Sequence, residues 1–518
     1  MKPRLPVLGG AAPPAANCTF AGGCGDVERP APALPPDAAA RLASHPCYSQ
    51  DAHHHFARMH VAVAPACNLQ CHYCNRKHDC ANESRPGVVS ERLTPDQALL
   101  KIQAVAAAVP QLSVVGIAGP GDPLANPAAT FQVLERVRRA LPDLTLCLST
   151  NGLALPDHVE RLAGLGVGHV TVTVNMVDPA IGERIYPWAV WRGRKVRGRD
   201  ASALLSERQL EGIERLVAGG VLVKVNSVVI PGVNDGHLAE VGRRLRGLGV
   251  FLHNLMPLIS AAEHGTHFGL TGQRGPTSDE LEAVQRACRT DVKLMRHCRQ
   301  CRSDAVGLLG EDRGQEFTLA GLPPGPAQDA ADVRAAHRAA VARRRERDEA
   351  ARRAALRAVG AVAEGLTARV AVATRGEGLV NQHFGHAREF LVYEVGRGGA
   401  SLLGTRAVER YCQGGDGEED TLAAVLRALA DCQAVLVAKV GHCPRGQLAA
   451  AGIEPVVEQA HRPVEAAALA WFAGFAARVA RGEAPLPCPT TAGHAAGPAA
   501  PAFPGHPGPG WRRAGGGL

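Results

Sequence analysis

The chain has 518 residues, which is long enough for two to four domains, and it is rich in glycine and proline and poor in aromatic residues. Its formal net charge of +8 is small for this length and does not demand nucleic acid or an anionic membrane as a partner. No apolar run reaches the ~18 residues of a membrane span, and the Pro-rich N-terminus lacks the apolar core of a signal peptide, so we expect a cytoplasmic protein.

The N-terminal half predicts a repeated strand–helix structure. Residues 1–44 are Pro/Gly/Ala-rich without periodicity, and we expect a disordered tail there. A first domain is expected over 45–315, and from about 55 to 260 its short apolar runs alternate with helical patterns. The expected strands cover 59–65, 112–119, 144–152, 169–175, 221–230 and 251–259. Six such repeats predict an α/β fold with a parallel sheet, either doubly wound or part of a barrel.

Alternation within these strands separates polar from apolar faces. In "LTLCLST", Thr145, Cys147 and Ser149 share one face and leucines occupy the other. In a barrel the apolar set would pack on the helices, and the polar set would line the interior. A polar interior is costly unless it holds water, a ligand or a cofactor, so we expect an open barrel with a site inside.

The C-terminal half predicts a second unit. Residues 316–366 contain an Ala-, Arg- and Glu-rich stretch, for which we expect a solvated linker helix, with a basic interaction surface as the alternative. Strand and helix patterns over 367–482 predict a second, smaller α/β domain. Residues 483–518 are again Pro/Gly/Ala-rich and are expected to form a disordered tail.

The fifteen cysteines are clustered, which in a large cytosolic chain favours metal binding over a disulfide framework. Cys67, Cys71 and Cys74 follow the first expected strand at C-x3-C-x2-C spacing, at the end of the barrel where active sites lie. Thiolates suit both zinc and iron–sulfur clusters. A four-iron cluster held by three thiolates leaves one iron open, so the fourth ligand can be a substrate or cofactor.

This motif, with Tyr73 before its last cysteine, resembles that of the radical S-adenosylmethionine (SAM) superfamily. The resemblance implies a partial (βα)6 TIM-like barrel, a [4Fe-4S] cluster that binds SAM through its open iron, and cleavage of SAM to a 5′-deoxyadenosyl radical. The long stretch from "HPCYSQDAHHHF" to "RLTP", with "AGPGDPLAN", "LSTNGL" and "HCRQCRSDAVGLLGED", resembles the maturases that build the precursor of the nitrogenase iron–molybdenum cofactor. The C-terminal part resembles the ribonuclease-H-like NifX/NafY-type domain that binds this cofactor.

The resemblance implies a reaction with three [4Fe-4S] clusters. Two are substrates, fused with a SAM-derived carbide and an extra sulfur into an [8Fe-9S-C] precursor, through SAM methyl transfer and radical chemistry of lyase or transferase type. The resemblance assigns Cys47, His60 and Cys147 to the first substrate cluster, and Cys80, Cys298 and Cys301 to the second. Apart from the resemblance, the sequence supports a ligand role only for Cys147, because this residue lies on a polar strand face. A histidine in a strand, such as His60, is by itself more typical of a core residue.

Further candidates surround the motif. "AGPGDPL" occupies the place of the superfamily's Gly-Gly-Glu-Pro element, so Gly119, Gly121 and Asp122 are expected at the methionine end of SAM, although Asp replaces the usual Glu. The other candidate SAM contacts are Tyr73, Asn151, Thr173, Asn175 and Ile230; ordinary barrel lining is the alternative.

Making a carbide removes every proton from a methyl carbon, which requires a base. Glu83 is the candidate, with Arg85 orienting it or neutralising charge; a surface ion pair is the alternative. In the C-terminal domain His383 and His386 are candidate metal ligands, with a fold-specific turn as the alternative.

The expected partners are cluster-delivery, cofactor-carrier and electron-donor proteins, without nucleic acid or membrane. Two other functions remain open. A radical SAM peptide modifier would usually concentrate its extra cysteines in a C-terminal extension, whereas a non-catalytic iron–sulfur carrier would leave the C-x3-C-x2-C barrel unexplained.

Overall fold

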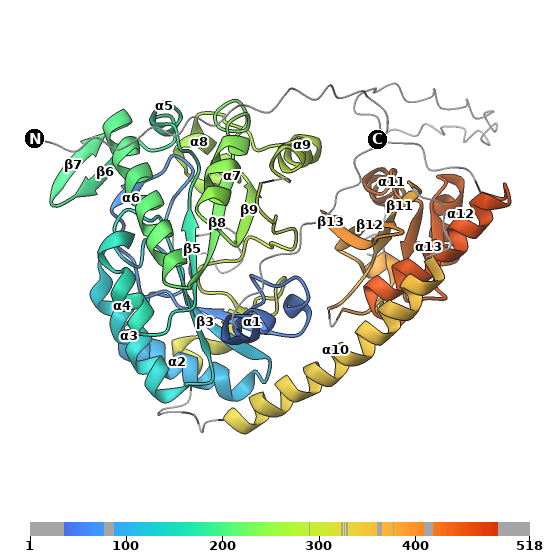
Figure 1. Ribbon diagram of the computed structural model, residues 1–518, viewed down its shortest axis with the longest axis horizontal. Helices are drawn as coiled ribbons and strands as arrows, with labels where there is room; N and C mark the ends of the chain where they lie inside the picture. Colours follow the sequence, from blue (N-terminus) through green and yellow to red (C-terminus); the bar gives the residue numbers. More distant parts are fainter. Residues whose placement is uncertain are drawn as a thin grey trace, which may run out of the picture.

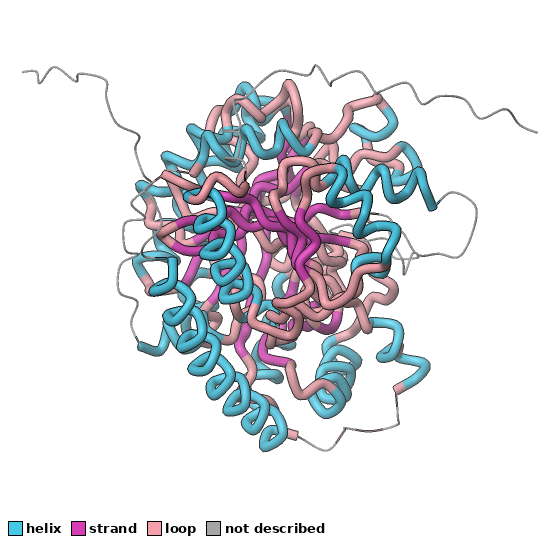
Figure 2. The backbone as a smooth tube through the Cα atoms, turned by 90° about the vertical axis from the view of Figure 1, so that its right-hand side faces the viewer, coloured by secondary structure: helices cyan, strands magenta, loops and turns pink. Residues whose placement is uncertain are grey.

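The computed structural model describes residues 36–76, 87–289, 291–322, 330–359, 365–376, 378–408 and 418–484, together with residues 325 and 327. Two main sheets organise these residues, each with helices packed around it (Figures 1 and 2). Among the described residues, no helix is both long and apolar enough to cross a bilayer.

The first sheet confirms the predicted partial (βα)6 barrel. Its six parallel strands run in the order β1, β3, β4, β5, β8, β9, and the short β10 adds an antiparallel edge beside β1. The bounds are β1 Ala57–His60, β3 Leu112–Ile117, β4 Thr145–Thr150, β5 His169–Thr173, β8 Leu222–Val229, β9 Leu252–Pro257 and β10 Val306–Gly307. All six strands expected from the sequence are present.

Helices connect consecutive strands and cover the outer face of this sheet (Figure 1). The connecting helices are α2 Pro95–Ala108, α3 Pro127–Ala140, α4 Val159–Gly164, α6 Gly198–Ala218 and α7 Leu238–Gly247. Short helices α5 Pro179–Gly182, α8 His267–Leu270 and α9 Ser278–Cys288 complete this part. The start of α2 shows how sequence fixes an element, since Thr94 and Gln97 cap each other reciprocally and Pro95 stands in the first turn.

The predicted separation of strand faces is confirmed in β4. Leu146 and Leu148 are buried in the core that the sheet shares with its helices, whereas Thr145, Cys147 and Ser149 alternate with them and are only partly buried. The polar face therefore lines the inside of the barrel, where cofactors and substrates can enter.

The sequence did not predict a small third sheet. It consists of β2 Leu69–Gln70, β6 Trp188–Trp191 and β7 Arg194–Arg197 in that order. The strand β2 lies inside the cysteine motif, and its two residues are too few to give a periodic pattern. Through this sheet, a hairpin from the β5–α6 connection is hydrogen-bonded to the cysteine loop.

The second main sheet confirms the smaller α/β domain. Its strand order is β13, β12, β11, β14, β15, with bounds Gly399–Ala407, Glu389–Gly396, Thr367–Val372, Ala434–Leu436 and Glu454–Val456. Helices α11 Glu418–Ala428, α12 His442–Ala450 and α13 Val464–Ala480 accompany it. Apolar residues on both faces of β11 are buried, so two core layers enclose the sheet.

Two predictions about the connecting segments need correction. The expected tail 1–44 contains helix α1, Pro36–Ala43, whose Ala43 carbonyl accepts a hydrogen bond from Arg345. The expected linker helix exists as α10, Ala331–Val359, but it is not simply solvated. Arg334 is fully buried and paired with Asp143 at 2.7 Å, because a charged residue can be buried when its partner is supplied across the interface.

Candidate active site

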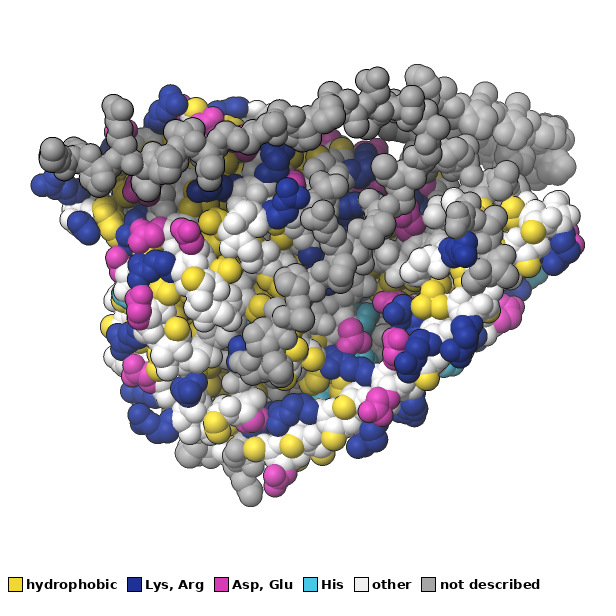
Figure 3. Space-filling view, in the orientation of Figure 1, with side chains coloured by type: hydrophobic (Ala, Val, Ile, Leu, Met, Phe, Trp, Pro, Cys, Tyr) yellow, Lys and Arg dark blue, Asp and Glu magenta, His cyan; other side chains and the backbone are white. Residues whose placement is uncertain are grey.

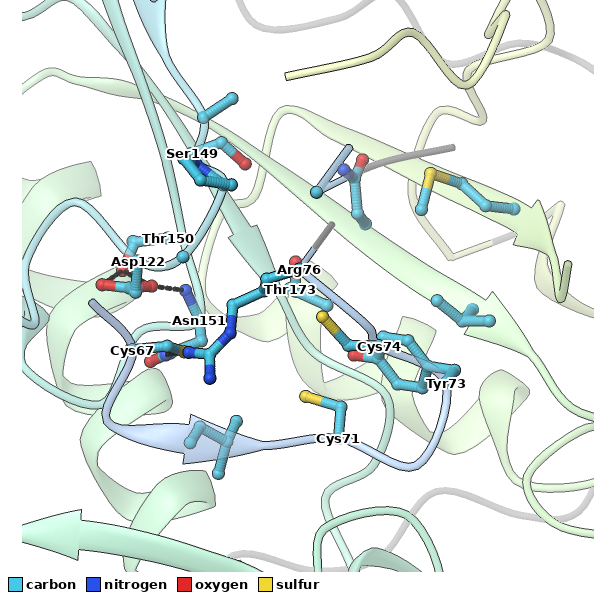
Figure 4. A pocket seen from close by; sticks show the side chains of 18 of the residues that line it. Cys67, Cys71, Tyr73, Cys74, Arg76, Asp122, Ser149, Thr150, Asn151 and Thr173 are labelled. Carbon is cyan, nitrogen blue, oxygen red and sulfur yellow. Dashed lines mark hydrogen bonds between the residues drawn. The ribbon is translucent and has the colours of Figure 1, made fainter. Parts of the chain in front are cut away.

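Three thiols meet at one pocket at the C-terminal end of the barrel. Cys67, Cys71 and Cys74 line a cavity of about 190 Å³ together with Tyr73 and Arg76 (Figure 4). Three soft sulfur ligands beside an open cavity fit a four-iron cluster with one unfilled iron position. Polar residues from the strand ends complete the lining: Asp122, Ser149, Thr150, Asn151, Thr173 and Asn226.

Burial disfavours the thiolate forms of Cys67 and Cys71 in the absence of metal. Desolvation is the main cause that raises the pKa of Cys67 to about 11, and the nearby Asp122 carboxylate adds to it. Burial also raises the pKa of Cys71, with Cys74 and Cys67 as further causes. At neutral pH such thiols deprotonate only when they bind an electropositive centre, so these side chains suit metal ligation better than free nucleophilic chemistry.

The Asp122 carboxylate connects the chain after β3 to the end of β4, next to the cysteine motif. The carboxylate is buried and accepts hydrogen bonds from the backbone nitrogens of Leu124 at 2.9 Å and Asn151 at 2.5 Å, and from the Thr150 hydroxyl at 2.9 Å. The side chain of Asn151 in turn lies 3.7 Å from the Cys67 sulfur. Asp122 therefore uses its oxygens to hold the ends of β3 and β4 together beside the cysteine loop.

Glycines allow the chain to pass close to the cysteine motif. A Cβ at Gly121 would come within 2.1 Å of the Ala66 carbonyl oxygen, and one at Gly119 would meet the Ser303 hydroxyl at 2.9 Å. The Asp122 backbone nitrogen donates to the same Ala66 carbonyl at 2.7 Å. Only glycine permits this approach at position 121, because the obstacle is backbone that cannot turn aside.

The remaining candidate SAM contacts differ in their placement. Thr173 lines the pocket, whereas Asn175 and Ile230 do not. Asn175 is fully buried and donates to the Tyr73 hydroxyl at 2.9 Å, so in this structure it positions a pocket residue. Ile230 is fully buried in the apolar cluster behind the cysteines.

A second constellation lies deeper in the barrel, on three neighbouring strands. His60 of β1 pairs in register with Gly116 of β3, and Gly116 pairs with Cys147 of β4. A Cβ at Gly116 would lie 3.1 Å from the His60 ring and 3.8 Å from the Cys147 Cβ. Because residue 116 has no side chain, the imidazole of His60 can lie close against this strand beside the thiol of Cys147, which the sequence signals as a glycine inside a strand.

The His60 ring is oriented for ligation. Its Nδ1 lies 3.1 Å from the Arg302 carbonyl oxygen, which can only accept, so Nδ1 carries the proton and Nε2 is left bare. Burial is the main cause that lowers the pKa of His60 to about 4, and the neighbouring Arg58 contributes. The imidazole is therefore neutral at physiological pH, as a metal ligand must be.

Cys47 reaches the same interior from the loop after α1. It lies near enough to Cys147, Cys298 and Cys301 for their charges to interact. Burial raises the pKa of Cys47 and raises that of Cys147 to about 12. Lys224 of β8 is also buried here, 5.2 Å from the centre of the Tyr48 ring, and among the described residues it forms no ion pair with a carboxylate.

The C-x2-C pair lies between this interior and the cysteine pocket. Asn254 donates to the Cys298 sulfur at 3.2 Å and to Asn226, which lines the pocket, at 3.0 Å. Gln300, between the two cysteines, lines the pocket as well. The buried guanidinium of Arg58 lies near enough to Cys301 for their charges to interact, and it donates hydrogen bonds to the carbonyls of Gly307 and Leu308.

The sequence did not predict four residues of the site: Asn254, Gln300, Arg58 and Gly116. Asn254, Gln300 and Arg58 act through contacts that join distant parts of the chain, so no local spacing marks them. Cys80, Glu83 and Arg85 lie outside the described residues, and their roles stay predictions.

In the second domain, His383 and His386 lie side by side, with ring centroids 4.7 Å apart. Desolvation and His386 lower the pKa of His383, whose Nδ1 accepts a hydrogen bond from the Gly385 nitrogen at 3.0 Å. Among the residues that the structure describes, no three His, Cys, Asp or Glu side chains form a compact single-ion site.

Buried histidines predict acid sensitivity of the iron-free protein. Burial is the main cause that lowers the pKa of His53, His169 and His297 to about 3 and of His253 to about 4. Unfolding exposes these rings, which then take up protons below about pH 6.5, so stability falls as the pH drops towards the folded values. Between pH 7 and 5.5 we expect a loss of about 1 kcal/mol for each histidine.

Urea unfolding of the iron-free protein at the two pH values measures this loss. His253→Gln, which removes a single buried ring, should reduce the loss between the two pH values by about 1 kcal/mol, the share of one histidine. An unfolding free energy that stays constant between pH 7 and 5.5 would contradict the assignment of neutral buried rings.

A parallel half-barrel with three cysteines at the mouth and a cavity beside them defines a radical SAM protein. The sequence model of the Radical SAM superfamily matches residues 61–245, and that of the Dinitrogenase iron-molybdenum cofactor family matches residues 367–474. Membership in this superfamily implies a [4Fe-4S] cluster and SAM, which decides against zinc at the cysteine motif.

Sequence relatives show to which family within the radical SAM superfamily this chain belongs. The FeMo cofactor biosynthesis protein NifB of Herbaspirillum seropedicae is 55% identical over 462 residues, covering 89% of this chain and 88% of that protein. NifB of Bradyrhizobium diazoefficiens is 54% identical over 90% of this chain and 92% of that protein, and NifB of Azotobacter vinelandii is 54% identical over 87% and 91%. The chain therefore belongs to the NifB family of FeMo cofactor biosynthesis proteins.

Proposed function

We propose that this radical SAM enzyme fuses two [4Fe-4S] substrate clusters, with a SAM-derived carbide and an additional sulfur, into the [8Fe-9S-C] precursor of the nitrogenase cofactor. The observation that carries the proposal is the row formed by His60, Gly116 and Cys147 inside the barrel that also bears the cysteine pocket. An imidazole and a thiol held side by side on neighbouring strands inside the barrel suit cluster binding better than peptide binding.

The cysteine pocket supplies the reactive end of the site. When bound, the cluster and SAM provide the one-electron chemistry that releases a 5′-deoxyadenosyl radical. Cys67, Cys71 and Cys74 would hold that cluster, and the neighbouring cavity would receive SAM. Asp122 connects its own loop to the loop at Asn151, and Gly121 allows the backbone of Ala66 to pass close by. Both residues therefore position the surface that would bind SAM.

The interior residues would hold the substrates. Cys47, His60 and Cys147 would bind the first substrate cluster, and Cys298 and Cys301, with Cys80, the second. Three protein ligands leave one iron of each cluster free, and an imidazole is displaced more readily than a thiolate. Both features favour rearrangement and release of the substrates over permanent storage.

Buried cations would balance the charge of these substrates. Clusters held by thiolates are anionic, and burying an anion without a compensating charge is costly. Lys224 and Arg58 are buried near enough to Cys47 for their charges to interact, and Arg58 interacts in the same way with Cys301. Glu83 and Arg85 are proposed as the base for the methyl protons and its charge partner.

The second domain would carry or dock the product. We place the catalytic domain from α1 to about residue 315, the linker at 316–366 and the carrier domain at 367–482. His383 and His386 would contact the product cluster, and cluster-delivery, cofactor-carrier and electron-donor proteins of nitrogenase assembly would be the partners.

Anaerobic reconstitution tests this function. With SAM and a reductant but no peptide, the protein should yield 5′-deoxyadenosine, S-adenosylhomocysteine and an extractable cluster that activates nitrogenase lacking its cofactor. A peptide modifier would form no such cluster and would require its peptide. A carrier would leave SAM intact, and either outcome would overturn the proposal.

A further inference from the structure

The hairpin of β6 and β7 projects from the barrel and is strongly basic. The segment 184–199 contains six Lys and Arg residues and no Asp or Glu. Arg192, Arg194, Lys195 and Arg197 are exposed, and among the described residues none of these four forms an ion pair with a carboxylate. Figure 3 shows Lys and Arg side chains at the upper left of the molecule, where Figure 1 places β6 and β7.

This hairpin is joined directly to the cysteine loop. Leu69 and Gln70, which lie between Cys67 and Cys71, pair with β6, and the Val190 nitrogen donates to the Asn68 carbonyl at 2.7 Å. Neighbouring strands are roughly 5 Å apart, so the hairpin backbone is one strand spacing from the loop of the proposed cluster ligands. Its cations lie in the turn and on β7, the next strand out from β6.

Two exposed apolar side chains border the same loop. Val190 is 38% exposed and Leu270 is 69% exposed, and they are two of the three large apolar side chains exposed in the described part of the chain. Leu270 ends α8, which contacts the loop through a 3.0 Å hydrogen bond from the Phe268 nitrogen to the His72 carbonyl. Apolar contacts within a charged rim are typical of protein–protein docking sites.

We propose that this surface, which consists of the β6–β7 hairpin and the end of α8, docks an acidic electron-carrier protein. The chemistry at the cysteine pocket consumes one electron each time SAM is cleaved reductively. The docked carrier gives up that electron to the group held by Cys67, Cys71 and Cys74 and is itself oxidised by one electron. The inference rests on the radical SAM chemistry and is independent of cluster fusion.

Charge complementarity supports this occupant over others. Opposite charge speeds the encounter of partners and favours short-lived complexes, which suits a carrier that must leave after each electron. Cations stack on the hairpin's own tryptophans, with Lys195 4.3 Å from the Trp188 ring centre and Arg208 4.5 Å from that of Trp191. These contacts order the basic surface before a partner arrives.

The test compares two electron sources in the full-length, iron-loaded protein. An acidic plant-type ferredoxin is the protein donor, and dithionite, a small anion that needs no docking surface, is the chemical donor. Arg194→Glu with Lys195→Glu should weaken ferredoxin binding, measured by calorimetry at low ionic strength, by 10-fold or more, and should slow ferredoxin-driven formation of 5′-deoxyadenosine similarly. The dithionite-driven rate should stay within twofold of that of the unmodified protein.

Control variants make the result specific. Arg343→Glu with Arg347→Glu reverses two exposed charges of α10, far from the hairpin, and should leave ferredoxin binding unchanged. Leu270→Asp should weaken ferredoxin binding without any change to the hairpin. Unchanged ferredoxin binding by the hairpin variant, equal loss with both donors, or tighter binding of a single-stranded oligonucleotide than of ferredoxin would overturn the proposal. Failure of cluster fusion alone, with SAM still cleaved, would contradict only the proposed function.

Discussion

Cys147→Ala should abolish formation of the eight-iron product while SAM is still cleaved. The thiol stands on the inner face of β4 across Gly116 from His60, away from the cysteine pocket that would hold the SAM cluster. Without it the proposed first substrate cluster would lose a ligand, so anaerobically loaded protein should contain about four fewer iron atoms. The yield of extractable product should fall by more than about 100-fold, beyond the effect usual for residues that only support a ligand.

Cys288→Ala is the matched control. This thiol is the last residue of α9 and is fully buried in the core, so its removal makes the same chemical change without touching the barrel interior. Iron content and product yield should therefore match those of the unmodified protein. Full iron content in the Cys147 variant would contradict the assignment of this residue to a substrate cluster.

Asp122→Asn should weaken SAM binding although the two side chains have the same shape. The carboxylate oxygens accept hydrogen bonds from two backbone nitrogens, those of Leu124 and Asn151, on opposite oxygens. Whichever way an amide is turned, its NH2 group faces one of these N–H donors, and a buried donor left without an acceptor costs about 1–3 kcal/mol. We expect a 10- to 100-fold loss in SAM affinity, measured by calorimetry, and a matching loss in the rate of 5′-deoxyadenosine formation.

A surface carboxylate provides the comparison. Asp96→Asn changes a side chain that is 85% exposed and pairs only with Arg136, so it should leave SAM affinity unchanged. If Asp122→Asn bound SAM as tightly as the unmodified protein, the hydrogen-bonded connection between the ends of β3 and β4 would not be what shapes the pocket.

Much of the architecture was predictable because it depends on local patterns. Short apolar runs between helical patterns predicted the six strands, and the polar face of β4 predicted a functional interior. The predicted tail missed α1, and the predicted solvated helix missed the buried face of α10, because in both cases the contacts that bury the segment come from elsewhere in the chain. The hairpin sheet escaped prediction because its strands are short and carry no apolar period.

The candidate ligands could be read from the chain alone: three cysteines at fixed spacing after a strand, a C-x2-C pair, and a thiol on a polar strand face. Spacing along one loop or one strand is local, so it can be read directly from the sequence. Contacts between distant residues emerged only from the folded barrel: the His60 ring lies against Gly116 beside Cys147, Asn254 joins Cys298 to the pocket, and a basic hairpin lies against the cysteine loop. Each depends on which strands become neighbours, and that is set by packing of the whole barrel.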